Sequence, residues 1–156
     1  KVPVLASALN DLPATFEQIA ATQSNIGRMK KAGVQVGVGM INDNEARQAQ
    51  LSMQYAGNLV ALNKVPGASG LSWDQAFAAI TSVPAEIAGM GAEIGSLRAG
   101  RKADVVIWDG DPLELTSGVQ AVWIDGVKQS LTSRQTRLRD RYTQPAEGAL
   151  PNAYDH

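Results

Sequence analysis

The first 41 residues alternate between an apolar run, a helical stretch and a second apolar run, and this order constrains the fold more than any other feature. The run over residues 2–8 ends at a turn signal, Asn10-Asp11-Leu12-Pro13. A helical segment from Ser24 to Gly33 leads into the β-rich run 34–41. Because strand–helix–strand units of this length have parallel strands, the front of the chain is predicted to be α/β.

Helical patterns fill the rest of the front of the chain. A first helical piece is expected from Thr15, and a long helix is expected from Asn44 to about Asn63. Ser72 is expected to cap another helix, and Pro84 to open a short one.

The character of the sequence changes after residue 92. Short β segments are predicted at 103–108, 119–124 and 127–131, and Asp125-Gly126 between the last two is a strong signal for a two-residue hairpin. The tail from residue 133 is charged and helix-prone at first and then contains Pro and Gly. The back of the chain is therefore predicted to be mostly β.

Composition and charge exclude several classes of function. The formal net charge is −1 and no stripe of Lys and Arg is interleaved with aromatic residues, which favours neither nucleic acid nor a membrane as partner. The absence of cysteine removes disulfides, thiolate nucleophiles and Cys-ligated zinc, and leaves the compartment, cytoplasmic or periplasmic, open. A small molecule or another protein is the expected partner.

The stretch Ile94–Asp109, IGSLRAGRKADVVIWD, resembles the segment with which amidohydrolase-superfamily chains return from their barrel to a small β-sandwich. Its neighbours resemble the corresponding family segments in the same order. Ala85–Gly89 is similar to the preceding helix, and Val122–Gly126 to the following hairpin. Further upstream, Ala32–Gly39 and Val2–Leu5 are similar to the last two barrel strands of imidazolonepropionase-like members.

This resemblance implies an α/β fold made of the last two strand–helix units of a (β/α)8 TIM barrel and the returning strands of a small β-sandwich. The implied division is a barrel part at 1–92, a β-sandwich (composite) segment at 93–132, and a C-terminal helix and tail at 133–156. An upstream part is expected to be missing, because chain starts are usually polar and frayed whereas an apolar strand begins here almost at once.

The resemblance also implies a divalent metal, with zinc the expected one, at the mouth of the complete barrel. Family members hold it with several histidines, often a lysine, and an aspartate after the last strand; a zinc hydrolase needs about three protein ligands. His156 is the only histidine in this chain, and as the last residue it is assigned no role. The chain therefore lacks the histidine ligands of such an enzyme, and alone it is expected to hold no metal.

Asp43 is the candidate for the last-strand aspartate, as metal ligand and as general base for the metal-bound water. The family usually places a Thr-Asp or Ser-Asp pair directly after the strand, whereas here the carboxylate is shifted, so a simple helix-capping role for Asp43 stays open. Asn10 and Asp11, which follow the preceding strand, are candidate substrate contacts. An ordinary turn is the competing interpretation of these two residues.

Other catalytic patterns do not appear. The spacing of Asp104, Asp109 and Asp111 lacks the terminal Glu of a calcium loop, and a strand with turns explains these residues. There is no G-x-S-x-G elbow, no P-loop and no complete dinucleotide-binding fingerprint after a strand.

Three hypotheses follow. In the first, the chain is the C-terminal part of a metal-dependent amidohydrolase that acts on the C–N bond of a small amide, dipeptide or cyclic ureide, and it is inactive alone. In the second, it is a non-catalytic assembly module that uses its exposed strand edges to form a homo-oligomer or to complete another chain's barrel. In the third, it is a proteolytic piece that stays bound to a complementary N-terminal chain.

Overall fold

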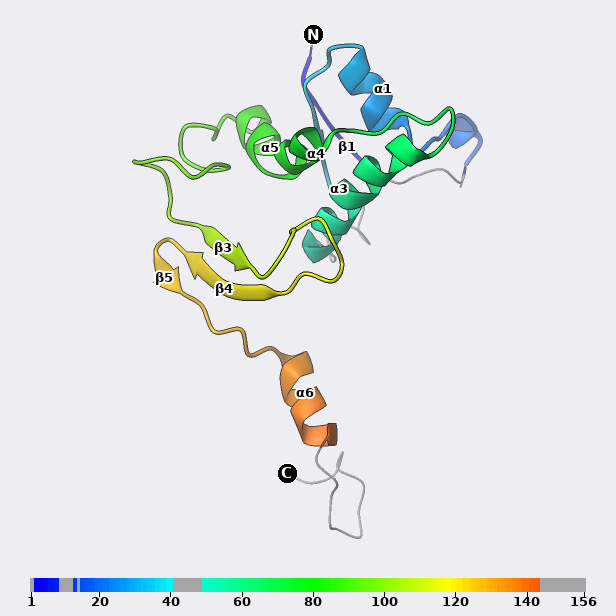
Figure 1. Cartoon of the computed structure of the whole chain (residues 1–156). Helices are drawn as coiled ribbons and strands as arrows, with labels where there is room; N and C mark the ends of the chain where they lie inside the picture. Colours follow the sequence, from blue (N-terminus) through cyan, green and yellow to red (C-terminus); the bar gives the residue numbers. More distant parts are fainter. Residues whose placement is uncertain (1, 9–12, 14, 41–48, 144–156) are drawn as a thin grey trace.

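The structure is a computed structural model, and it describes residues 2–8, 13, 15–40 and 49–143. Its architecture is mixed α/β. Figure 1 shows a helix-covered pair of strands near the N-terminus, a separate antiparallel sheet, and a final helix that stands away from both.

The predicted parallel strand pair is confirmed. β1 (Val4–Ala6) lies beside β2 (Val36–Val38) in parallel, with Val4 opposite Val36 and Ala6 opposite Val38. All three residues of β2 are buried, and α1, α4 and α5 contact this strand. Near-continuous apolar sequence is typical of parallel strands covered on both faces, which accounts for the valines of this run.

A glycine in the middle of β2 allows the helices to approach the strand closely. A Cβ atom on Gly37 would lie 3.0 Å from the Leu5 side chain, 3.2 Å from Pro84 and 3.3 Å from the carbonyl oxygen of Ala79. These neighbours come from β1 and from α4 and α5, two of the three helices that cover the strand. Any side chain at position 37 would therefore push one of these layers outward.

The connection between the two strands contains less helix than predicted. The piece expected from Thr15 is a single 3-10 turn, η1 (Phe16–Gln18), and Phe16 is 85% exposed. The apolar spacing was misleading here because these side chains bury nothing, and one short turn without tertiary packing does not extend into a helix. The second piece is confirmed as α1 (Asn25–Lys31), and Gly33 just beyond it has a φ of 73°.

Three further helices pack over the strand pair and on one another. The described part of the predicted long helix comprises η2 (Ala49–Leu51), α3 (Ser52–Ala61) and η3 (Leu62–Lys64). Ser72 caps α4 (Trp73–Ile80), as predicted, and forms a capping box with Gln75. α5 (Ser82–Ile87) begins two residues before Pro84, which therefore lies in the first turn, where its missing N–H costs no helical hydrogen bond.

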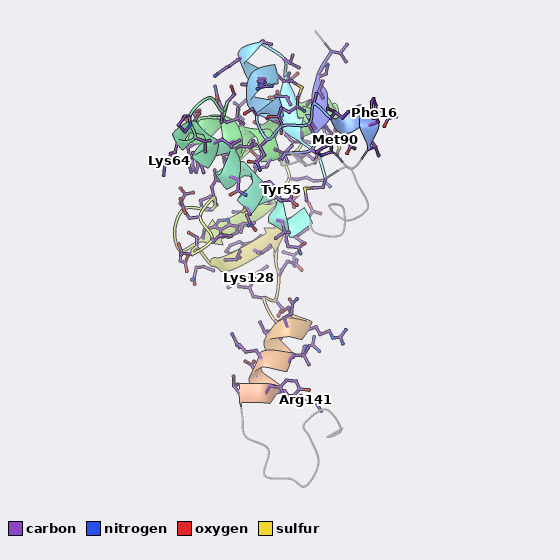
Figure 2. All side chains as sticks on the ribbon, turned by 90° about the vertical axis from the view of Figure 1, so that its right-hand side faces the viewer. Phe16, Tyr55, Lys64, Met90, Lys128 and Arg141 are labelled. Carbon is purple, nitrogen blue, oxygen red and sulfur yellow. The ribbon has the colours of Figure 1, made fainter. Side chains whose placement is uncertain are left out.

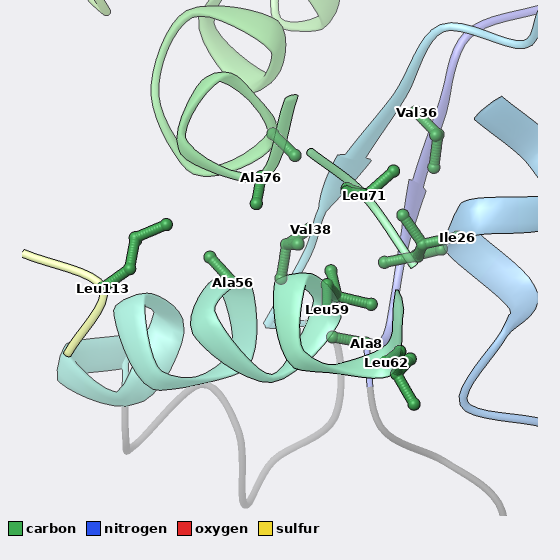
Figure 3. Packing of buried hydrophobic residues seen from close by; sticks show 12 residues of the cluster. Ala8, Ile26, Val36, Val38, Ala56, Leu59, Leu62, Leu71, Ala76 and Leu113 are labelled. Atoms are coloured by element: carbon green, nitrogen blue, oxygen red, sulfur yellow. The ribbon is translucent and has the colours of Figure 1, made fainter. Parts of the chain in front are cut away.

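The core lies between the strand pair and these helices, and small and aliphatic side chains fill it (Figure 3). Ile26, Ala56, Leu59 and Ala76 have no exposed surface. Figure 3 also shows Leu113, from the loop after β3, reaching over α3 beside Ala56. The loop of the second sheet thus contributes to the core of the first part of the chain.

The second sheet has the order β3-β4-β5 and is antiparallel throughout. β3 (Val105–Trp108), β4 (Val119–Ile124) and β5 (Val127–Lys128) form it, with an irregularity between Ile107 and Trp108. Asp125 and Gly126 join β4 to β5 with φ angles of 51° and 78°, as a two-residue turn of type I′ requires, so the predicted hairpin is confirmed.

α6 (Arg134–Thr143) follows the sheet and has no buried residue. Figures 1 and 2 both show it separated from the rest of the protein by an extended linker. Among the helices that the structure describes, α6 included, none is long and apolar enough to cross a membrane.

Candidate functional site

The carboxyl ends of β1 and β2 lie at the same edge of their sheet, because the two strands are parallel and paired in register. The backbone N–H of Gly39 donates to the carbonyl oxygen of Ala6 at 2.9 Å, which extends the pairing to this edge. Both Ala8 and Gly39 are buried there. The segments that follow the two strands therefore start side by side.

The predicted site residues belong to these two segments but lie outside the described residues. Asn10 and Asp11 follow β1 by four and five positions, and Asp43 follows β2 by five. In open and closed parallel sheets alike, ligands bind beyond the carboxyl ends of the strands. The fold brings the starting points of the two segments together, and the roles of the three residues stay predictions.

A metal implied by the family resemblance is not matched by the donors in the described part of the chain. Among residues 2–8, 13, 15–40 and 49–143, no three His, Cys, Asp or Glu side chains are grouped closely enough to hold an ion. His156, the only histidine, falls outside these ranges. The described residues therefore do not fit a zinc centre, which needs about three protein ligands.

The aspartates around β3 have structural partners. Asp104 accepts a hydrogen bond from the backbone N–H of Asp125 at 2.7 Å, and Asp109 accepts one from that of Gly118 at 2.6 Å. Asp111 accepts from the backbone N–H of Leu113 and from the indole N–H of Trp73, both at 2.9 Å. These carboxylates stabilise turns and the contact of the loop with α4, in agreement with the strand-and-turn interpretation.

Among the described residues, Glu17 has a carboxyl group whose pKa departs from its usual value. Hydrogen bonds from its own backbone N–H and, to a smaller extent, from the Thr15 hydroxyl lower the pKa of its carboxyl below the usual value. Because the side chain is fully exposed at the first turn of η1, this is the behaviour of a helix-start residue. A lowered pKa makes the carboxylate a weaker base, so Glu17 is not a candidate for proton abstraction.

A cavity lies between the helices and the second sheet. Its volume is about 450 Å³, and its lining is mostly apolar, with side chains of Met53, Phe77, Ile80, Val106 and Trp108. Lys102 and Asp104 are the charged residues that line it, and the Asp104 carboxylate already accepts a hydrogen bond from the sheet hairpin. The cavity can hold an apolar group but brings together no set of catalytic side chains.

Sequence reasoning did not single out this cavity, because its lining comes from α3, α4, the connection after α5, and β3. No local pattern relates segments so far apart along the chain. The cavity is also not lined by Ala8, Val38 or Gly39 at the ends of the parallel strands, so it is distinct from the predicted site.

Three comparisons with known proteins each match an amidohydrolase. The sequence profile of the amidohydrolase family matches residues 11–128. The amidohydrolase tasK of Hapsidospora irregularis is 45% identical over 60 residues, which are 38% of this chain and 6% of that protein. The crystal structure of an amidohydrolase from Thermotoga maritima MSB8 superposes with a TM-score of 0.65 at 27% identity, over 81% of this chain and 30% of the other.

This chain thus spans less than a third of the solved relative and a much smaller share of the curated one. The residues that match the family profile include β2, the helices α1, α4 and α5 that cover it, and all three strands of the second sheet. Since the family profile covers well over half of the sequence, the chain belongs to the amidohydrolase family.

Proposed function

We propose that the chain forms the last two strand–helix units of a (β/α)8 barrel, together with the returning strands of a small β-sandwich, in a metal-dependent amidohydrolase. The observation that carries the proposal is the parallel β1–β2 pair, covered by α1, α4 and α5, in a chain that matches 30% of a solved amidohydrolase. The reaction class is hydrolysis of a C–N bond in a small amide, dipeptide or cyclic ureide.

Unpaired strand edges support a larger barrel around this chain. Within the described residues, β1 pairs only with β2, so each strand has one edge without a partner. A two-stranded parallel sheet is not stable as an independent unit, and its outer N–H and C=O groups need pairing. The missing strands would come from a complementary N-terminal chain or segment.

The metal, for which zinc is the expected identity, would be held mainly by residues outside those described, since the described donors do not fit it. No reaction step is therefore assigned to it. Within this chain, Asp43 is the proposed carboxylate ligand and proton acceptor, and Asn10 and Asp11 are the proposed contacts to substrate. All three come from segments that start at the carboxyl edge of the strand pair.

A second candidate function is a non-catalytic assembly module derived from an amidohydrolase. The same unpaired edges of β1 and β2 favour it, because they can pair with another chain without any catalytic group. The absence of a donor cluster in the described ranges is compatible with either function.

Native mass spectrometry combined with elemental metal analysis separates these candidates. If the chain belongs to a working hydrolase, the purified material contains a second, longer chain with a His-x-His segment and stoichiometric metal. A chain that is alone, metal-free and self-associated would instead support the assembly module and remove Asp43 from the catalytic residues. Proteolysis of one precursor is recognised when the two chains have contiguous sequences.

The role of Asp43 is tested in the metal-bearing complex with Asp43→Asn. General-base catalysis contributes about 10²–10⁴-fold to a rate, so kcat is expected to fall by that order, and bound metal to fall if the carboxylate is also a ligand. Asp74→Asn is the matched control, because Asp74 is an exposed residue in the first turn of α4. An Asp43→Asn complex with unchanged kcat and metal content would reduce Asp43 to a helix cap.

A further inference from the structure

The cavity between the helices and the second sheet has no part in the proposed hydrolase site, and its size suits a small molecule. Met53 of α3, Phe77 of α4 and Trp108 of β3 supply large apolar side chains to its lining. Its volume of about 450 Å³ lies within the range of about 300–1,000 Å³ of small-molecule sites. Such sites are mostly apolar and have a few placed polar groups, as this cavity does.

The cavity lies on the face of β3 that carries Val106 and Trp108. These two residues alternate along the strand and both line the cavity, whereas Ile107 between them does not. Val105, at the start of the strand, also contributes to the lining. In the proposed β-sandwich a second sheet would pack on one face of β3, and the face that carries Ile107, which is 48% exposed, is open for it. A ligand in the cavity and the second sheet would therefore use opposite faces of the strand.

The loop before β3 forms one wall of the cavity and is held in place by several contacts. Residues 94–97 of this loop line the cavity. Gly95 has a φ of 84° and packs so closely on α5 that a Cβ atom there would lie 2.6 Å from the Cβ of Ala85. The guanidinium of Arg101 donates hydrogen bonds to a carbonyl oxygen of the loop and to the hydroxyl of Ser96. This wall is therefore preorganised, which lowers the entropic cost of binding.

The charged groups beside the cavity favour an anion. Residues 95–104 contain three cations, Arg98, Arg101 and Lys102, and one acid, Asp104, so their net charge is +2. Lys102 lines the cavity and makes no ion pair with any residue that the structure describes. The Asp104 carboxylate accepts a hydrogen bond from the backbone N–H of Asp125 at 2.7 Å and is thus engaged by the β4–β5 hairpin. Lys102 is the charged group of the lining that is left to meet a ligand.

We propose that the cavity binds an amphipathic carboxylate, with its hydrocarbon chain among the apolar side chains and its head group at the ammonium of Lys102. The Ser96 hydroxyl accepts a hydrogen bond from Arg101 and keeps its own proton available to donate to this head group. Leu97 lines the cavity and is 76% exposed, so a bound chain would cover apolar surface that is open to solvent. Medium-chain fatty acids are the simplest ligands of this class.

Binding is tested on the full chain by fluorescence titration, and the test is independent of the hydrolase proposal because no activity is measured. The probe is ω-bromooctanoate, whose bromine quenches tryptophan emission, and Trp108 lies in the lining of the cavity. Quenching is expected to saturate with the concentration of the acid. Trp108→Phe should remove most of it, because the other tryptophans do not line the cavity. The neutral analogue ω-bromooctanol should bind several-fold more weakly than the acid.

Lys102→Met tests the head-group contact, since it removes the charge and keeps a long side chain. Affinity for ω-bromooctanoate is expected to fall by about fivefold, because a charge-assisted hydrogen bond at an exposed position is lost. Affinity for ω-bromooctanol should stay the same. A purely structural effect of the substitution would weaken the binding of both probes alike.

Val106→Phe tests the position of the hydrocarbon chain, and Ile107→Phe is its matched control. The two residues are neighbours in β3 with similar exposure, 42% and 48%, but only Val106 lines the cavity. Val106→Phe should weaken the binding of both probes by about tenfold or more, because the new ring occupies the space of the chain. Ile107→Phe should leave binding unchanged, and circular dichroism checks that both variants keep the fold.

Three results would overturn the proposal. Quenching that does not saturate, or that persists in Trp108→Phe, would mean that the acid does not bind in the cavity. Equal loss of both probes in Lys102→Met would mean that the carboxylate is not recognised there. Release of a bound chain by Val106→Phe but not by Ile107→Phe, seen by native mass spectrometry, would identify a protein segment as the occupant instead.

Discussion

The front region (residues 2–91) and the back region (residues 92–143) are stabilised in different ways. Of the fourteen buried apolar residues in the described chain, twelve lie in the front region, and only Leu113 and Ala121 lie in the back region. The front region buries side chains between strands and helices, whereas the back region depends on backbone pairing and tight turns. Its sheet leaves Val106, Ile107, Ile124 and Val127 substantially exposed.

The two regions also differ in the kind of surface that they leave open. In the front region all three residues of β2 are buried, but within the described residues β1 and β2 each have one edge without a partner strand. In the back region the central strand is paired on both sides, but apolar side chains are uncovered. Among the described residues, the front region therefore leaves backbone groups of strand edges unpaired, while the back region leaves apolar side chains exposed.

Truncating the core of the front region should have the largest effect. Leu59 in α3 is fully buried, so Leu59→Ala removes packed methyl groups and leaves a cavity. The free energy of unfolding is expected to fall by about 2–5 kcal/mol. Urea denaturation followed by circular dichroism at 222 nm measures this loss.

Leu115→Ala is the matched control for this truncation. Leu115 lies in the back region and is 78% exposed, so the same chemical change should alter stability by less than about 0.5 kcal/mol. Similar losses for the two variants would show that Leu115 is covered in solution, and the contrast between the regions would then be wrong at this position.

The contact between the regions should be sensitive to an added methyl group on α3. A Cβ atom on Gly57 would overlap the carbonyl oxygen of Leu113. Gly57→Ala is therefore expected to displace the loop 109–117 and to cost about 1–2 kcal/mol, because overpacking outweighs the gain in helix propensity. Tryptophan emission reports the displacement, since the loop accepts the hydrogen bond of Trp73 through Asp111.

Asn58→Ala, at an exposed position of the same helix, makes a comparable propensity change without the overlap. It should leave the emission unchanged and stability the same or slightly higher. If Gly57→Ala behaved in the same way, the two regions would not be joined at this point.

The sequence predicted best where local chemistry decides the conformation. The Asp125-Gly126 turn, the cap at Ser72 and the stop at Gly33 depend on a few neighbouring residues, and each is found in the structure. The apolar spacing at Phe16 and Ile19 failed because it indicates a helix only if a surface exists to cover it. The packing of Leu113 over α3 also had no local signal, since 50 or more residues separate the partners.

For the candidate site, the sequence predicted the edge of the parallel strand pair at which it lies, but not its full set of residues. The order of strand, helix and strand places the segments with Asn10, Asp11 and Asp43 at one edge, and the pairing of β1 with β2 supports that placement of their starting points. A zinc site needs about three protein ligands, and the sequence of this chain contains a single histidine. Spacing within this chain therefore cannot specify the complete site.

Altering the hairpin turn should have a smaller and more local effect. Gly126 has a φ of 78°, where a Cβ atom costs about 1–2 kcal/mol, so Gly126→Ala should weaken the β4–β5 pairing. Hydrogen exchange of the Gln129 amide, which donates to Val122, is expected to accelerate while the amides of β2 keep their protection. Asp125→Gly is the control, since glycine accepts the φ of 51° there and should preserve the pairing. Faster exchange throughout β2 in Gly126→Ala would show that the two regions unfold together. They would then form one cooperative unit, although they are stabilised in different ways.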